Sequence, residues 1–120
     1  MKPTIVAVDD NPSNITLLEQ ILSDIYHVIT FYNPLEVIEY MNHSKAQLIL
    51  ADLIMPEMNG IELMKTVKKS HPYLPFIIIS AYDEHHDIQK AYDNGVYKYL
   101  IKPIDIPHLF ETIEKALRIS

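Results

Sequence analysis

Five short apolar runs alternate with segments of helical periodicity, and this alternation constrains the fold more than any other feature of the sequence. The runs are Ile5–Val8, His27–Tyr32, Leu48–Ala51, Phe76–Ser80 and Val96–Ile101. Short apolar runs without a polar break are typical of strands that are buried on both faces. Strands that alternate with helices form a parallel sheet with right-handed crossovers and helices on both sides. The predicted fold class is therefore α/β.

The segments between these runs carry apolar residues at the spacing of one helix face. We predict helices from Pro12 to about Ile25, from Pro34 through Met41, from Gly60 to a stop before Pro72, over Asp83–Asp93, and from about Ile106 to Ile119. In the second of these helices Leu35, Ile38 and Met41 share one face. Asn11 is placed to cap the first helix, and Asn94-Gly95 predicts a helix stop.

Composition narrows the class of protein. The chain of 120 residues predicts a single domain over residues 1–120, long enough to bury a core. The formal net charge of −6 argues against direct nucleic-acid binding, because phosphate contacts need clustered Lys and Arg. The absence of cysteine excludes disulfides and thiolate metal sites, and it fits a cytoplasmic location. We find no signal peptide and no apolar run of the roughly 20 residues that a membrane helix needs.

Polar side chains stand where four of the predicted strands end. Asp9 and Asp10 follow the first strand, Asp52 follows the third, Ser80 ends the fourth and Lys102 follows the fifth. In an open parallel sheet, ligands bind beyond the carboxyl ends of the strands, near the switch in strand order. Each residue alone has an ordinary explanation, as a turn residue, a strand-end hydroxyl or a surface lysine. Their common position at one edge of the sheet favours a shared site.

The residue types in this set predict phosphoryl chemistry. Three carboxylates repel one another unless a cation joins them, and Mg²⁺ typically takes one or two carboxylates with waters and phosphate oxygens. Lys102 supplies a positive charge for one phosphoryl oxygen, and the Ser80 hydroxyl can donate to another. A carboxylate in such a site can act as a nucleophile and form an aspartyl phosphate. The cofactor we expect is Mg²⁺.

Four motifs make the chain resemble the receiver domains of two-component response regulators, including the chemotaxis regulators. They are Val8-Asp9-Asp10, the segment Asp52–Gly60, Ser80-Ala81 and Lys102-Pro103. The resemblance covers essentially the whole chain. It implies a flavodoxin-like, doubly wound sheet of five parallel strands in the order 2-1-3-4-5, with five helices. It also implies a phosphorylation-controlled switch that catalyses only its own phosphorylation and dephosphorylation.

The resemblance also implies a role for each site residue. Asp52 accepts a phosphoryl group from a histidine kinase or a phosphotransfer protein. Asp10, Asp52 and the backbone carbonyl of Ile54 bind Mg²⁺, and Asp9 acts mostly through water.

Signalling roles follow from the same resemblance. Lys102 and Ser80 contact the phosphoryl oxygens, and Tyr99 is the aromatic residue that changes rotamer on activation. Ser80 is drawn toward the new phosphoryl group and frees space that Tyr99 can enter. The surface formed by the last two predicted helices and the strand between them then docks a partner, a second copy of the domain or an attached output domain.

Two further features bear on the lifetime and shape of the site. In receiver domains the residues two positions after the phosphorylated Asp and two after the Ser commonly tune how long the phosphoryl group persists. Here they are Ile54 and Tyr82, and neither carries a carboxylate or amide that would easily orient an attacking water, so we expect slow self-dephosphorylation. The Lys102-Pro103 bond is often cis in this family.

Three other functions are compatible with parts of the pattern. A phosphatase with an aspartyl nucleophile after its first strand should have Asp-x-Asp there, whereas Asp9 and Asp10 are adjacent. A flavin-binding protein should present Gly and hydroxyl groups in that loop, whereas Asp9–Pro12 is anionic and lacks Gly. A receiver fold used as an unphosphorylated interaction module is the third. Glu84–Asp87 contains metal-binding residue types, but adjacent histidines on a helix point apart.

Overall fold

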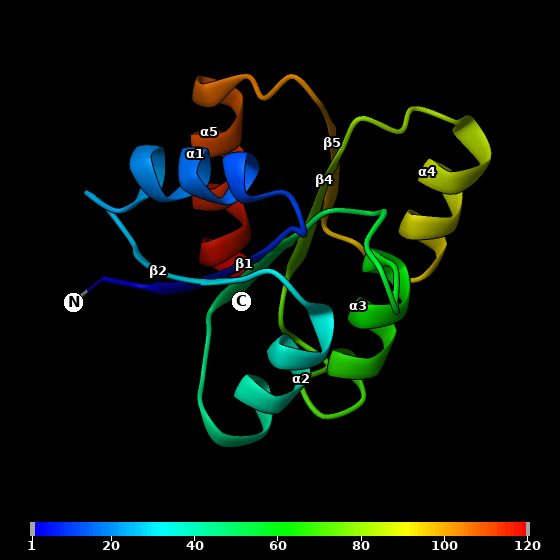
Figure 1. The fold of residues 1–120 in the computed structure, drawn as a ribbon, viewed down its shortest axis with the longest axis horizontal. Coiled ribbons are helices and arrows are strands. Elements are labelled where there is room, and N and C mark those ends of the chain that lie inside the picture. The colour runs from blue at the N-terminus through cyan, green and yellow to red at the C-terminus, as the bar shows by residue number, and fades with distance from the viewer. Residues whose placement is uncertain (1, 120) are drawn as a thin grey trace.

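Each apolar run of the sequence forms a strand, and a helix follows each strand (Figure 1). The computed structural model describes residues 2–119. Its elements are β1 (Thr4–Val8), α1 (Pro12–Leu22), β2 (His27–Phe31), α2 (Pro34–His43), β3 (Leu48–Ala51), α3 (Gly60–Lys68), β4 (Phe76–Ser80), α4 (His85–Asp93), β5 (Lys98–Ile101) and α5 (Ile106–Ile119). The predicted alternation is confirmed.

The strands form one parallel sheet in the order β2-β1-β3-β4-β5. The order reverses between β1 and β3, where the chain first moves outward to β2 and later returns to the other side of β1. Val8 pairs with Ala51 at this point, so the residues that follow β1 and β3 emerge side by side. The predicted flavodoxin-like fold is confirmed.

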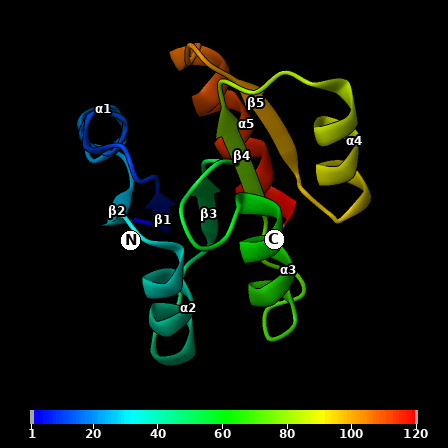
Figure 2. The ribbon, with the colours of Figure 1, turned by 45° about the vertical axis from the view of Figure 1, so that its right-hand side comes forward.

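Helices cover both faces of the sheet, with α1 and α5 on one face and α2, α3 and α4 on the other (Figures 1 and 2). Successive strand residues point to opposite faces, so each strand supplies both core layers. The layer under α1 and α5 takes Ile5, Ala7, Leu48, Leu50, Ile77 and Ile79 from the sheet. The layer under the other three helices takes Val6, Val8, Ile49, Ala51, Phe76 and Ile78. Burial of each large aliphatic side chain contributes about 1.5–3 kcal/mol, which explains why the three central strands β1, β3 and β4 are almost entirely apolar.

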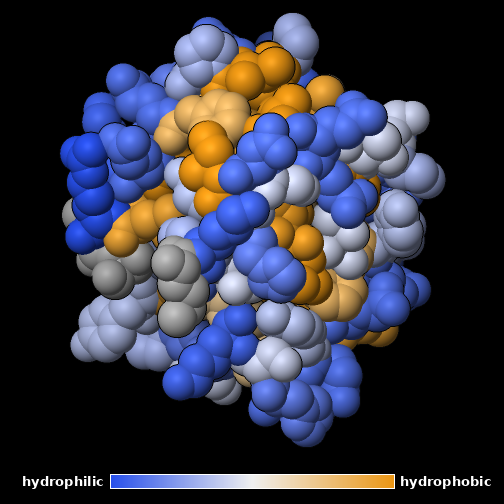
Figure 3. Space-filling model, turned by 90° about the vertical axis from the view of Figure 1, so that its left-hand side faces the viewer, coloured by the Kyte–Doolittle hydropathy of each residue, from blue (hydrophilic) through white to orange (hydrophobic). Residues whose placement is uncertain are grey.

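Packing of the helices leaves a mixed outer surface. The face seen in Figure 3 is mostly hydrophilic, and apolar side chains interrupt it in separate patches. Among residues 2–119, no helix is both long enough and apolar enough to cross a membrane.

The first helix is shorter than predicted. α1 ends at Leu22, and Ile25 lies outside the helix with 52% of its surface exposed. The amide of Tyr26 donates to the carbonyl of Leu22, and this turn places Tyr26, which is 7% exposed, in the core instead. The helical spacing of Ile25 was therefore misleading, because the larger neighbouring side chain fills the site.

The structure also differs from the sequence prediction at one end of β2, α4 and β5, and in the buried face of α2. β2 ends at Phe31, α4 begins at His85 and β5 begins at Lys98, so each is shorter than predicted. In α2 the buried residues are Pro34, Val37 and Met41, while Leu35 is exposed. The proline that begins α2 packs inward, and this turns the buried face away from Leu35.

Asparagine side chains begin the first three helices. The side-chain oxygens of Asn11, Asn33 and Asn59 each accept a backbone N–H of the first turn, which otherwise has no partner within the helix. Gly95 has a φ of 99°, so the helix stop predicted after α4 is confirmed. The Lys102-Pro103 peptide bond is cis.

Candidate functional site

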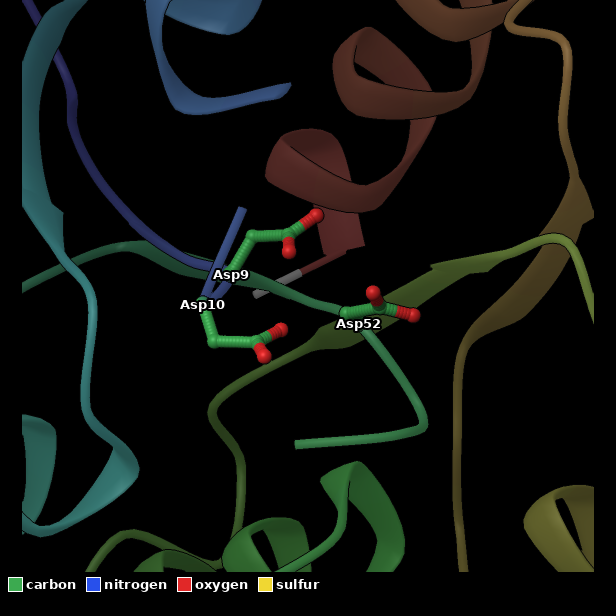
Figure 4. Close-up of side chains that lie close together, drawn as sticks. All are labelled: Asp9, Asp10 and Asp52. Carbon is green, nitrogen blue, oxygen red and sulfur yellow. The ribbon is translucent and has the colours of Figure 1, made fainter. Parts of the chain in front are cut away.

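Three carboxylates meet at the carboxyl edge of the sheet, where the strand order reverses. Asp9 and Asp10 follow β1 and Asp52 follows β3, and Figure 4 shows that their side chains lie close together. One oxygen from each carboxylate lies within 4.8 Å of the others. The structure therefore brings together the acidic residues that the sequence singled out.

Asp9 is the most buried member of this acidic cluster, with 4% of its surface exposed. Its Oδ1 accepts the backbone N–H of Asn11 at 2.9 Å, and its Oδ2 accepts the side-chain amide of Asn14 at 2.9 Å. These two donors fix the orientation of the carboxylate and satisfy both of its oxygens.

Lys102 is the cation of the cluster. Its Nζ lies 3.3 Å from Oδ2 of Asp9 and 3.4 Å from Oδ2 of Asp52, so one ammonium group bridges two carboxylates. The backbone N–H of Lys102 donates to the carbonyl of Ser80 at 2.9 Å, which anchors the residue to the end of β4. Its side chain is 21% exposed, so solvent screens these ion pairs only in part.

The negative charge of Asp52 is only partly compensated by its surroundings. Burial raises the pKa of the Asp52 carboxyl above its ordinary value, and the nearby charge of Asp9 raises it further. Lys102 and the backbone N–H of Leu53, which donates to Oδ1 at 2.7 Å, oppose this change without cancelling it. An additional cation at this place would stabilise the ionised form of Asp52.

The acidic cluster has the donor chemistry of a magnesium site. Its three carboxylates outnumber the one ammonium group of Lys102, and hard divalent cations prefer oxygen ligands. The cluster also opens to solvent, because Asp10 is exposed and Asp52 is half-buried. An ion could thus keep several waters, as Mg²⁺ usually does. Ile54 lies in the loop after Asp52, and the role of its carbonyl stays a prediction.

The loop after Asp52 depends on Gly60, which we predicted only as the start of a helix. A Cβ atom at Gly60 would lie 2.4 Å from the carbonyl oxygen of Asp52, closer than real contacts allow. The N–H of Gly60 also donates to the carbonyl of Leu53 at 2.8 Å. The first turn of α3 therefore packs directly on the backbone that carries Asp52.

Sequence reasoning also missed Asn14. An amide side chain in the first turn of the helix that follows Asp9-Asp10 is a signal that could have identified it, because that turn lies beside the carboxylate of Asp9.

Ser80 and Tyr99 form a second group of contacts on the neighbouring strands. Ser80 is 2% exposed, and its Oγ accepts the backbone N–H of Tyr82 at 3.1 Å. Tyr99 is 6% exposed, and its hydroxyl donates to the carbonyl of Tyr82 at 2.6 Å. Burial raises the pKa of the Tyr99 phenol, which keeps it a neutral donor. The ring already occupies an inward position, so its movement on phosphorylation stays a prediction.

This fold and this site define a receiver-type signalling domain, and comparison with known proteins assigns the family. The model of the "Response regulator receiver domain" family matches residues 5–114, and the chain belongs to this family. Acceptance of a phosphoryl group as a conformational signal is the general function of the family, so the chain is a signalling switch. The match favours this function over the phosphatase and flavin alternatives.

Relatives by sequence are regulators of transcription. The chain is 34% identical over 117 residues to the transcriptional regulatory protein GlrR of Escherichia coli K12. This alignment covers 97% of the chain and 26% of that protein. It is 36% identical over 111 residues to the DNA-binding transcriptional regulator NtrC of the same organism, covering 92% of the chain and 24% of that protein. The chain thus spans about a quarter of the length of these relatives.

Solved structures agree on the fold. A response regulator receiver domain protein (CheY-like) from Methanospirillum hungatei JF-1 superposes with a TM-score of 0.92 at 25% identity, covering 98% of this chain and 95% of that chain. The chemotaxis response regulator CheY4 of Vibrio cholerae gives a TM-score of 0.88 at 24% identity, covering 97% and 99%. At this identity the second likeness shows the fold alone.

Proposed function

We propose that Asp52 is the residue of this receiver domain that accepts the phosphoryl group, from a phosphohistidine of a histidine kinase or a phosphotransfer protein. A carboxylate oxygen of Asp52 attacks the phosphorus atom and a P–O bond forms. The P–N bond to the donor histidine breaks, and its electron pair returns to the imidazole nitrogen, which takes up a proton. The observation that carries the proposal is the position of Asp52 beside Lys102, whose Nζ lies 3.4 Å from Oδ2.

Exposure favours Asp52 over Asp9, and the contact with Lys102 favours it over Asp10. Both oxygens of Asp9 already accept protein donors, and its side chain is only 5% exposed, against 13% for that of Asp52. Asp10 is exposed at the rim of the cluster. Only Asp52 combines access for a phosphoryl donor with a fixed position next to Lys102.

Asp10, Asp52 and the backbone carbonyl of Ile54 would hold Mg²⁺ in this proposal, with Asp9 acting mostly through water. Both oxygens of Asp9 already accept hydrogen bonds from the protein, and this supports an indirect role. When bound, the ion supplies positive charge for the phosphoryl oxygens. Lys102 supplies a second positive charge, and it is already positioned by its pairs with Asp9 and Asp52.

Phosphorylation of Asp52 then changes the contacts of Ser80 and Tyr99. The phosphoryl group adds nearly two negative charges and new acceptor oxygens. Charge-assisted hydrogen bonds contribute about 1.5–3 kcal/mol each, and inverting a 1:99 equilibrium takes about 5.5 kcal/mol. Contacts from Lys102, Ser80 and backbone amides are therefore enough to switch the domain.

The output of the switch is the α4–β5–α5 surface, which we propose docks a partner, a second copy as a homodimer, or an attached output domain. The domain itself catalyses only its own phosphorylation and dephosphorylation. A cytoplasmic location and the absence of direct nucleic-acid binding belong to the same proposal, which treats residues 1–120 as one receiver domain. The side chains of Ile54 and Tyr82 are exposed and carry no carboxylate or amide that would easily orient an attacking water, which supports slow self-dephosphorylation.

Acetyl phosphate, a small phosphoryl donor, tests this function without knowledge of the kinase. Incubation with acetyl phosphate and Mg²⁺ should add one phosphoryl group to the intact mass of the wild-type protein. The adduct should be absent from Asp52→Ala and from wild-type protein in EDTA. An unmodified wild-type mass, or an adduct that persists in Asp52→Ala, would contradict the proposal.

A further inference from the structure

Helix α4 is weakly anchored to the domain. Among its nine residues only Ala91 is buried, whereas α3 buries five of its nine. Its N-cap residue, Glu84, makes no side-chain capping bond. Figure 2 shows α4 at the outer side of the sheet, beside β5. With so little apolar burial, individual polar contacts gain weight in fixing the position of this helix.

One such contact joins α4 to the edge of the sheet. The backbone N–H of Tyr99 in β5 donates to the hydroxyl of Tyr92 in α4 at 3.0 Å. β5 is an edge strand, and N–H groups on the outer side of an edge strand lack a partner in the sheet. The Tyr92 hydroxyl takes the place of that missing partner. It therefore ties a partly exposed residue of α4 to the backbone of Tyr99.

Tyr99 is also connected to the phosphorylation site, through its own side-chain hydroxyl. The Tyr99 hydroxyl donates to the carbonyl of Tyr82, and the N–H of Tyr82 donates to Oγ of Ser80. An unbroken series of contacts thus runs from the Ser80 hydroxyl through Tyr82 and Tyr99 to Tyr92. A change of partner at Ser80 alters the first contact, and α4 lies at the last.

We propose that Tyr92 is a positioning residue whose hydroxyl couples α4 to Tyr99, so that the helix and the buried ring respond to phosphorylation as one unit. This inference rests on the proposed function of Asp52 and Ser80. Without the hydroxyl, α4 would keep only the contacts of Ala91 and its partly buried neighbours. Phosphorylation would still occur, but its effect would stop at Tyr99.

The test compares wild-type protein with Tyr92→Phe, which removes one oxygen and keeps the ring. Tyr82→Phe is the matched control, since Tyr82 is 45% exposed against 41% for Tyr92, and its hydroxyl makes no hydrogen bond among residues 2–119. Amide hydrogen exchange is measured by NMR for Tyr99 and for α4, with and without beryllofluoride and Mg²⁺ as a phosphoryl analogue. Core amides of β4 report on global stability.

We expect the Tyr99 amide of unliganded Tyr92→Phe to exchange about three- to tenfold faster than in wild type, the factor that corresponds to one ordinary hydrogen bond. Beryllofluoride should change the exchange of α4 amides in wild type and in Tyr82→Phe, and this change should be reduced by a similar factor in Tyr92→Phe. The β4 amides should be unaffected.

Two results would overturn the inference. Unchanged exchange of the Tyr99 amide in Tyr92→Phe would mean that the hydrogen bond does not protect it. A full response of α4 to beryllofluoride in Tyr92→Phe would mean that the hydroxyl is only structural. Failure of wild-type protein to bind beryllofluoride would contradict the proposed function as well. Normal binding, with a response of α4 in Tyr92→Phe equal to that in wild type, would contradict this inference alone.

Discussion

Replacement of Asp52 by Asn should stabilise the protein in the absence of divalent cations. The Asp52 carboxyl has a raised pKa, caused first by burial and then by the charge of Asp9. A carboxyl with a raised pKa in the folded state binds its proton more tightly when folded, so stability falls as the pH rises from the unfolded value through the folded one. At neutral pH the wild-type protein carries this full cost, and Asn removes it with little change in shape.

The distances give the size of the effect. At an effective dielectric constant of about 20, a like charge within 4.8 Å repels Asp52 by at least about 3.5 kcal/mol, and the ammonium group of Lys102 at 3.4 Å attracts it by about 5 kcal/mol. Repulsion from Asp9 therefore offsets most of the attraction, and solvent screens the repulsion from the exposed Asp10. The cost of burying the charge adds to this balance. We expect Asp52→Asn to be more stable by about 1–2 kcal/mol.

Urea unfolding followed by circular dichroism in EDTA measures this difference. At neutral pH the midpoint of Asp52→Asn should exceed that of wild type, and the gain should disappear below the ordinary carboxyl pKa of 3.8. The control Asp24→Asn, at an exposed position in the turn after α1, should change stability by less than about 0.5 kcal/mol. Saturating Mg²⁺ should stabilise wild type much more than Asp52→Asn. A variant less stable than wild type in EDTA, or a gain of equal size in acid, would refute the charge balance described for the cluster.

Three other substitutions test separate parts of the site. Gly60→Ala should lower stability by about 1–2 kcal/mol and slow phosphorylation. The added methyl group forces the Asp52 backbone to shift, and this cost outweighs the gain of about 1 kcal/mol in helix propensity. A variant that is more stable in urea unfolding would count against the close contact. Lys102→Ala should cost about 2 kcal/mol in EDTA and recover much of it in Mg²⁺, and equal losses in both conditions would argue against a shared charge site. Wild-type phosphoprotein should lose its phosphoryl group slowly, as followed by intact mass. Ile54→Asn should shorten the lifetime of the phosphoprotein about tenfold or more, equivalent to ~1.4 kcal/mol in the activation free energy of hydrolysis. Rapid decay of the wild-type phosphoprotein would contradict this expectation.

The parts of the fold that the sequence predicts are those with local causes. Unbroken apolar runs such as Phe76–Ser80 can only be buried strands here, and Asn11 and Gly95 mark a helix start and a helix stop by their own backbone chemistry. The edge of the sheet at which Asp52 and Lys102 meet follows from parallel topology, without any detail of packing. These predictions agree with the structure because each depends on a short stretch of chain or on the topology of the sheet alone.

The parts that the sequence does not predict depend on contacts that form only when a loop or turn has folded. The role of Gly60 arises from the carbonyl of Asp52, which approaches it only in the folded chain. Nothing in the sequence indicates the contact of Tyr92, because only the folded chain places a backbone N–H of β5 beside its hydroxyl. Likewise, the choice between Ile25 and Tyr26 as a core residue depends on how the chain turns after α1. In each case a loop or turn brings the deciding partner into place, and the spacing of residue types carries no information about it.

The identity of the phosphorylated residue tests the central claim most directly. Protein treated with acetyl phosphate and Mg²⁺ is reduced with borohydride, which converts an aspartyl phosphate to homoserine, and the peptides are sequenced by mass spectrometry. We predict homoserine at position 52 and unmodified aspartate at Asp9 and Asp10. Homoserine at either of those two positions, or its absence from protein that has gained the phosphoryl mass, would contradict the assignment of Asp52.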